Sequence, residues 1–279
     1  MPNSPILTFK KPEHPSLTPH INYYYFYQSK AVTSHVEFIH FPHFKRTLNC
    51  FKDASITLSK YCREVVHAPK GSYTHIFHRH LKFPRKAILE GPFDIIGISF
   101  HPLGIFHFID DDLAEQGHEF FFAQLGKAFN QQITQVFQKD SAVEKGELLD
   151  QFFVNCYRPF HHQHLQKAVQ LILGHQGNIS LQEICATLGV SRRTLHRYFT
   201  RYMACSFRDF KTVVKFRNAF DQYFQADQTN KLSELAYWAN YYDQSDFISQ
   251  FKTKTNATPT ELLPHITPTA SELFWKFSS

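Results

Sequence analysis

Apolar positions along the chain change their spacing before the middle of the sequence. Up to about residue 110, short runs of aromatic or β-branched residues are separated by Gly and Pro, a pattern typical of strands. These runs lie at 23–27, 36–41, 54–61, 73–78 and 93–100. From about residue 111 the apolar residues recur every three or four positions, which indicates helices. The sequence therefore predicts an α+β N-terminal domain, a strand-rich core plus helices, followed by an all-α C-terminal part.

A polar break at 157–163 divides the helical pattern, and we place a linker there. The helices before it, at 111–156, are expected to pack on the sheet or to pair two chains. The predicted segments are a flexible proline-rich arm at 1–19, a sensing or dimerisation domain at 20–156, the linker, an all-α domain at 164–263 and a tail at 264–279. We expect the apolar residues at 272–277 to fold the tail back onto the protein.

Two segments of the all-α part share one pattern of apolar residues. The first has apolar residues at 181, 184, 185 and 188, and the second has them 51 residues later, at 232, 235, 236 and 239. Gly189 and Asn240 then mark turns, because both residue types tolerate the left-handed backbone that ends a helix. Beyond the turns the displacement becomes 52, so the second turn holds one extra residue. The repeat predicts two copies of a helix-turn-helix module.

The second helix of the first copy carries a cluster of basic residues. Ser191 is a favourable N-cap for it. If Leu195 and Phe199 face the core, the opposite face presents Arg193, His196 and Arg197. One α-helix fits the major groove of DNA, where arginine pairs with guanine through two hydrogen bonds. Phosphates are the expected counterparts of the further basic residues, which are Arg192, Arg201, Arg208, Lys211, Lys215 and Arg217.

A helical pattern without Gly or Pro at 206–225 predicts a linker helix of about 30 Å. DNA repeats every 34–36 Å or so, and a rod of this length would hold the two modules against successive major grooves. A row of arginines on one helix is usually only a solvated face. The repeat, the turns and the linker helix together make a DNA-reading domain the better interpretation.

The stretches ISLQEICATLGVSRRTLHRYFTRYMACSFRDF and KLSELAYWANYYDQSDFISQFKTKTNATPTEL carry a family resemblance. Over residues 164–263 the chain resembles the DNA-binding domain of the AraC/XylS transcription regulators. The resemblance implies two helix-turn-helix subdomains joined by a long helix, with base contacts from both second helices. In the second module these contacts fall on Gln244, Ser245 and Ser249. The full set of predicted DNA-binding residues is Ser191, Arg192, Arg193, His196, Arg197, Arg201, Gln244, Ser245, Ser249 and Lys252.

The chain departs from the family pattern at several places. Ala204, Asn240 and Asn256 stand where the family usually has glycine, which costs little if asparagine takes the left-handed conformation. Asp246 stands where a polar or basic residue is usual, and the second module is net negative. We therefore expect the first module to supply most of the affinity for DNA.

The front half resembles one large subset of the same regulators through IIGISFHPLGIFHFI at 95–109, followed by DDDLAEQ. That domain has no generally assigned ligand, so the resemblance implies architecture and little chemistry. His78 and His80 would share one strand face and are candidates for a metal site. Pro84 and Arg85 stand where a cupin-type metal site needs a carboxylate, and the chain has 18 histidines, so we predict no metal and no cofactor.

Other residues with reactive or ligating side chains have structural interpretations. His161, His162 and His164 indicate a solvated linker. A redox role for Cys205, near a helix entry, is a minor alternative. No Gly-rich phosphate loop, G-x-S-x-G or H-E-x-x-H motif occurs, so we predict that the protein is not an enzyme. Five scattered cysteines without a CxxC pair favour a reducing cytoplasm. The N-terminal stretch lacks the apolar run of a signal peptide, and no apolar run is long enough to span a membrane.

The net charge of +6 mildly favours polyanionic partners. The sequence thus predicts a sequence-specific transcription regulator that binds double-stranded DNA. A small-molecule effector, RNA polymerase and a second copy of the chain are further candidate partners. The alternative is a protein-interaction module that keeps the fold and has lost specific DNA binding, for which the acidic second module is the reason.

Overall fold

The computed structural model describes residues 4–59, 62–78, 83–109, 119–121, 126–225, 232–268 and 275–277. Contacts divide the chain into two compact units. The strand-rich unit holds residues 1–38, 45–79 and 86–160. The helical unit holds residues 39–44, 80–85 and 161–279. The fold is therefore a strand-rich N-terminal region followed by a helical C-terminal region, as predicted.

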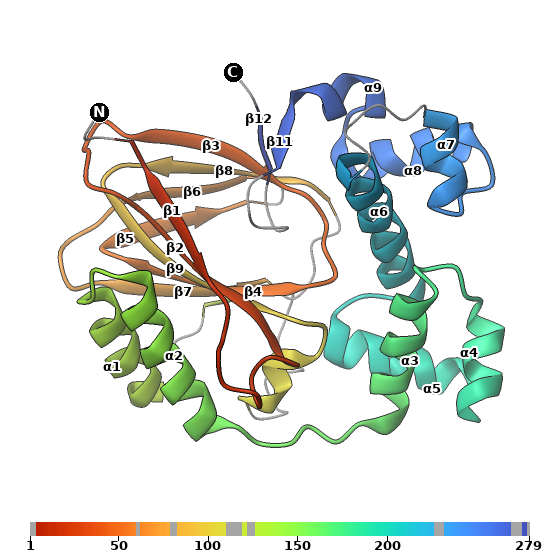
Figure 1. Ribbon diagram of the computed structural model, residues 1–279, viewed down its shortest axis with the longest axis horizontal. Coiled ribbons are helices and arrows are strands. Elements are labelled where there is room, and N and C mark those ends of the chain that lie inside the picture. The colour runs from red at the N-terminus through yellow and green to blue at the C-terminus, as the bar shows by residue number, and fades with distance from the viewer. Residues whose placement is uncertain are drawn as a thin grey trace. The chain divides into compact units, whose positions relative to one another are not determined.

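An antiparallel sheet forms the centre of the strand-rich unit (Figure 1). Its strands, in spatial order, are β1 (Ile6–Lys10), β2 (Ile21–Ser29), β9 (Phe93–Phe100), β4 (Arg46–Lys52), β7 (Tyr73–His78) and β10 (Glu119–Phe121). β9 is buried along nearly its whole length, which explains its unbroken apolar run in the sequence. Gly97 lies opposite Tyr25, whose ring occupies the space that a Cβ would need.

A second sheet contains the shorter and more polar strands. It runs β3 (His35–His40), β8 (Arg85–Glu90), β6 (Cys62–His67) and β5 (Ala54–Leu58), with β6 and β8 parallel. In β6 the buried and exposed residues largely alternate, as in a strand with one covered face. The sequence pattern missed β4, β6 and β8, because each mixes charged residues with apolar ones and none forms a continuous apolar run.

Two helices, α1 (Gly126–Phe137) and α2 (Ala142–Cys156), pack on the first sheet, and Figure 1 shows them side by side. The hydroxyl of Tyr24 in β2 donates to the Asp150 carboxylate in α2 over 2.7 Å. Phe153 of α2 meets Phe100 of β9 edge to face, with ring centroids 5.9 Å apart. Of the two roles considered for these helices, the structure therefore shows packing on the sheet.

Two segments differ from the sequence prediction. Within the expected flexible arm, Ile6–Lys10 is β1 and pairs with β2, because its prolines flank the strand and do not interrupt it. Glu119–Phe121, expected to be helical, is β10 and pairs with β7. Pairing with a neighbouring strand overrode the helical spacing there, and the next residue of that pattern, Leu125, lies outside the described residues.

The helical unit consists mainly of short helices around one long one. They are α3 (Gln163–Gly174), α4 (Leu181–Leu188), α5 (Arg192–Tyr198), α6 (Phe207–Gln225), α7 (Leu232–Trp238), α8 (Gln244–Thr255) and α9 (Pro259–Leu262). A π-helical turn at Phe199–Met203 follows α5. α6 contacts α3 on one side and α7 and α8 on the other (Figure 1). Ser206 caps α6, since its hydroxyl accepts the Asp209 N–H over 3.0 Å.

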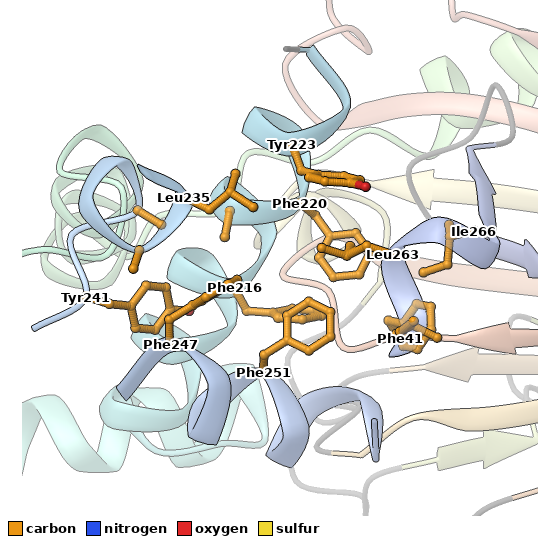
Figure 2. Packing of buried hydrophobic residues seen from close by; sticks show 14 residues of the cluster. Phe41, Phe216, Phe220, Tyr223, Leu235, Tyr241, Phe247, Phe251, Leu263 and Ile266 are labelled. Atoms are coloured by element: carbon orange, nitrogen blue, oxygen red, sulfur yellow. The ribbon is translucent and has the colours of Figure 1, made fainter. Parts of the chain in front are cut away.

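A residue from the N-terminal half completes the core of the second module, as Figure 2 shows. Phe41 is only 1% exposed, and its ring centroid lies 5.8 Å from that of Phe220 in α6. Phe220 in turn stacks on Phe251 of α8 at 5.5 Å. The run predicted as strand at 36–41 thus ends at His40, and burial of Phe41 draws residues 39–44 into the helical unit. A domain over 20–156 is accordingly interrupted at this point.

The chain closes with two short strands, β11 (Ile266–Pro268) and β12 (Trp275–Phe277). They pair with each other, and Trp275 also pairs with Ile39. Residues 275–277 therefore turn back onto the protein, whereas residues 272–274 of the same predicted segment lie outside the described residues.

Candidate nucleic-acid interface

The first module is a helix-turn-helix built by three local signals. Ser180 and Glu183 form a capping box at the start of α4, with the Ser180 N–H donating to the carboxylate over 2.7 Å. These hydrogen bonds hold the pKa of Glu183 below its ordinary value. Gly189 ends α4 in the left-handed conformation, with φ of 64°. Ser191 then caps α5 by accepting the Thr194 N–H over 3.0 Å. The turn and the start of α5 are where the sequence placed them.

The two faces of α5 differ as its spacing requires. Leu195 and Phe199 are fully buried. The side chains on the opposite face and just beyond it are exposed, and they are Arg192, Arg193, His196, Arg197 and Arg201. The helix therefore presents hydrogen-bond donors outward over two turns, without burying any of them.

His162 departs from the expected solvated linker. It caps α3 by accepting the Leu165 N–H at Nδ1 over 3.4 Å. Its ring also meets the rings of Tyr198 and Tyr202 edge to face, at 4.2 and 5.1 Å. Aromatic contacts from the end of α5 make the N-terminus of α3 part of the first module, while His164 is exposed, as expected.

The second module repeats this design with one extra residue in its turn. Asn240 takes the left-handed conformation with φ of 57°, so asparagine replaces glycine there without an unusual backbone. Asp243 caps α8 by accepting the Asp246 N–H over 2.8 Å. The exposed residues of α8 include those named from the sequence, Gln244, Ser245, Ser249 and Lys252.

Tyr242 was not singled out from the sequence, yet it is 93% exposed at the entry to α8. Its backbone N–H donates to the Asp246 carboxylate over 3.3 Å, which fixes the turn. The sequence did contain a signal for Tyr242. The displacement between the two copies rises from 51 to 52 at this turn, which shows that the turn holds an extra residue.

The acidic residues of the second module sit at helix starts. Asp246 accepts hydrogen bonds from the Tyr242 N–H and from the Gln250 side chain. Glu261 completes a capping box with Thr258, and these hydrogen bonds lower the pKa of its carboxyl. A carboxylate in the first turn is stabilised by the partial positive charge of the helix N-terminus. Helix capping thus accounts for these acidic residues. Their negative charge is also the reason why this module is expected to bind DNA less tightly than the first.

Two basic residues expected to meet phosphates are used inside the protein. Arg217 is 1% exposed and donates to the carbonyl oxygens of Phe41 and Pro42, at 3.0 and 2.7 Å. Lys215 is half-buried and donates to the carbonyl oxygen of Asn240 over 2.5 Å. Both lie on faces of α6 that pack against neighbouring segments, which charge counting along the sequence could not reveal.

Three further features considered from the sequence are a metal site, a redox cysteine and a membrane-spanning helix. Within the described part of the chain, no group of three or more His, Cys, Asp or Glu is placed to hold a metal ion. His80, one of the two histidines of the metal hypothesis, lies outside the described residues. Cys205, the residue of the minor redox alternative, is buried, at 8% exposure. None of the helices that the structure describes combines the length and the apolar character needed to cross a membrane.

Comparisons with known proteins find the helix-turn-helix and place it in these residues. Residues 184–264 match a family model described as a helix-turn-helix domain, and residues 164–201 match one described as an HTH domain. No curated protein matches the chain.

Three solved structures are similar to this chain. ToxT from Vibrio cholerae is 12% identical, with 94% of this chain and 98% of ToxT covered and a TM-score of 0.48. The C-terminal domain of AraT, a response regulator from Geobacillus stearothermophilus, is 21% identical, with 39% and 90% covered and a TM-score of 0.35. The xylose-binding transcription activator xylR is 21% identical, with 38% and 27% covered and a TM-score of 0.31. With the two capped modules on α6 and the family match over 184–264, the chain carries a helix-turn-helix domain in its C-terminal part.

Proposed function

We propose that this protein is a sequence-specific transcription regulator whose α5 and α8 enter the major groove of DNA. Arg193, His196 and Arg197 read base edges from α5, and Gln244, Ser245 and Ser249 do so from α8. Phosphates are met by Ser191, Arg192, Arg201 and Lys252. One observation carries the proposal. α5 is the capped second helix of a helix-turn-helix, and its polar face, opposite the buried Leu195, is exposed.

The length of α6 supports contact with successive grooves. The helix has 19 residues, which corresponds to about 28 Å at about 1.5 Å per residue. DNA repeats every 34–36 Å or so, and side chains at both ends of α6 extend the span. One chain would then contact two half-sites on one face of the duplex.

The first module supplies most of the affinity in this proposal. Its recognition helix is basic and exposed, and arginine–guanine pairs discriminate by about 1–3 kcal/mol each. The second module offers neutral polar side chains at Gln244, Ser245 and Ser249, and its acidic residues serve as caps. We therefore assign to α8 a role in selecting the second half-site.

We further propose that the strand-rich unit controls DNA binding through a small-molecule effector or through self-association. The segment at 39–44 supports this, because it continues into β3 and β4 and also places Phe41 in the core that holds α8. A change in either strand would then alter the packing of the second module. RNA polymerase and a second copy of the chain are the further partners that the proposal includes.

Selection of bound fragments from a random DNA pool, with the full chain, tests the function. We expect enrichment of one sequence with two half-sites about one turn apart. Binding should weaken steeply with salt, since the slope of log affinity against log salt is about −0.9 per phosphate contacted. The double variant Arg193→Ala/Arg197→Ala should lose the enriched sequence. Arg208→Ala removes an expected phosphate contact outside the recognition helix, so it should bind more weakly and still enrich the same sequence. No enrichment by the unaltered chain would refute the proposal.

The second candidate function is a protein-interaction module that no longer reads DNA. Exposed aromatic residues on the second module favour it, since Tyr237 and Tyr242 are 77% and 93% exposed. Such a module would enrich no DNA sequence in the same selection, and any residual DNA binding would not distinguish one duplex from another.

A further inference from the structure

One face of α6 touches the turn between α3 and α4, which leads into the first module, and the turn of the second module. Lys211, Lys215 and Asn218 lie at i, i+4 and i+7, so their side chains follow one another along this face. Lys215 and Asn218 each make a hydrogen bond to a different module. The relative placement of α5 and α8 therefore depends on contacts made within two turns of α6.

The contact with the first module is made at the turn after α3. Asn218 donates from its side-chain amide to the side-chain carbonyl of Gln176 over 3.2 Å. Gly177, with φ of 78°, packs so closely on α6 that a Cβ there would come within 2.6 Å of Lys215 Cγ and 2.7 Å of the Lys211 carbonyl oxygen. Only glycine allows this approach. The aliphatic part of Lys215 is thus held by the first module.

The contact with the second module is made by the other end of the same side chain. The Lys215 ammonium donates to the carbonyl oxygen of Asn240 over 2.5 Å and lies over the ring of Tyr241, 4.8 Å from its centroid. Asn240 ends α7, and Tyr241 is buried in the core just before the cap of α8. Lys215 therefore holds the turn that sets where α8 begins.

The chemistry of this site exceeds what packing alone requires. Burial, together with the nearby Lys211, lowers the pKa of Lys215, and the carboxylate of Asp246 acts in the opposite sense. An apolar side chain of the same length would fill the space without desolvating an ammonium group. The hydrogen bond and the cation–π contact are what the lysine adds, and both are directional.

We infer that Lys215 is a positioning residue that fixes the phase between the two recognition helices and so sets the spacing of the half-sites that the protein accepts. The inference rests on the proposed function. One base pair adds about 3.4 Å and about one tenth of a turn between half-sites. A rigid pair of modules loses its second contact under that change, because linked binding fails when the geometry forbids simultaneous engagement.

The test measures affinity against spacing. The duplex enriched by the unaltered chain is remade with one base pair inserted or removed between the half-sites, and dissociation constants are measured at one salt concentration. We expect the unaltered chain to lose about tenfold or more per altered base pair, which corresponds to about 1.4 kcal/mol. Lys215→Met should bind the remade duplexes within about threefold of the original one. It should keep its affinity for a duplex with only the first half-site.

Matched variants separate phase from charge and from folding. Lys211→Met removes the same charge from the same face and should keep the spacing profile of the unaltered chain. Lys215→Arg can still donate to Asn240 and lie over Tyr241, so it should restore the profile. Asn218→Ala, a milder change at the other contact, should flatten the profile in part, and it serves as the second variant if Lys215→Met loses helical content.

Two failures have different meanings. If the substitutions at Lys215 and Asn218 leave the spacing profile unchanged, the inference is overturned and the proposed function stands. If the unaltered chain enriches no duplex, the proposed function fails and removes the inference with it.

Discussion

The guanidinium of Arg217 in α6 donates to the carbonyl oxygen of Phe41, a residue 176 positions earlier in the chain. A second hydrogen bond from the same group reaches the carbonyl oxygen of Pro42 over 2.7 Å. The Phe41 side chain, meanwhile, fills the core against Phe220. Backbone and side chain of one short segment are thus both used by the second module, which makes residues 39–44 a structural part of the helical unit.

Phe41→Ala should destabilise the helical unit strongly. Truncating a fully buried phenylalanine costs about 3–5 kcal/mol, because apolar contacts are lost and a cavity remains. The measurement is thermal unfolding followed by the helical circular dichroism signal. Val32→Ala, at a position that is 77% exposed, is the control and should change stability by less than about 0.5 kcal/mol. An unaltered helical transition in Phe41→Ala would show that the segment is not part of this core.

Ala204→Gly should stabilise the first module. Ala204 is held at φ of 53°, a conformation that costs an L-residue with a side chain about 1–2 kcal/mol. Glycine removes this strain, but it also increases the conformational entropy of the unfolded chain, which favours unfolding. We therefore expect the free energy of unfolding to rise by up to about 1 kcal/mol. The same substitution at the exposed Ala186, inside α4, should instead lower stability by about 1 kcal/mol. Chemical denaturation of the two variants should therefore shift in opposite directions.

Loss of one recognition-helix side chain should cost more in the first module than in the second. Arg193→Ala or Arg197→Ala should weaken binding to the enriched duplex by about 1–3 kcal/mol, since an arginine–base pair is lost. Gln244→Ala should cost less, because α8 carries no arginine. Gel-shift titrations compare the three variants at one salt concentration, and equal losses would reject the asymmetry.

Tyr242→Phe and Tyr242→Ala should weaken DNA binding without changing the preferred sequence. The residue is exposed at the entry to α8, where we expect its phenolic hydroxyl to meet a phosphate, and phosphate contacts position a protein without reading bases. We expect similar losses for both variants when the hydroxyl makes the contact. Relative affinities for duplexes with altered half-sites should stay as in the unaltered chain. A changed sequence preference would identify Tyr242 as a base-reading residue instead.

The strand-rich unit should lose stability as the solution becomes acidic. His20 stacks on His107 with ring centroids 3.6 Å apart, and burial lowers the pKa of His20 below its ordinary value of 6.5. The unfolded chain then takes up a proton at a higher pH than the folded chain does, so stability falls as pH drops below about 6.5. His20→Phe keeps a stacking ring that cannot be protonated and should reduce this loss.

Urea unfolding at about pH 7.5 and about pH 5.5 measures the effect in the unaltered chain and in His20→Phe. His164→Phe, an exposed position, is the control and should leave the pH dependence unchanged. If His20→Phe loses as much stability on acidification as the unaltered chain, the stacked histidine pair is not the cause.

The sequence by itself determined the elements that short-range rules control. Gly189, Ser191 and the repeat of apolar positions specify where α4 ends and α5 begins, because capping and left-handed turns depend on a few neighbouring residues. The same spacing turned the arginines of α5 outward. Only the tertiary structure decided where Phe41, Lys215 and Arg217 lie, since their partners are 25 to 179 residues away in the chain. Distant contacts of this kind leave no periodic signal in the sequence. Because of them, Lys215 and Arg217 pack inside the helical unit and not on the expected DNA-binding surface.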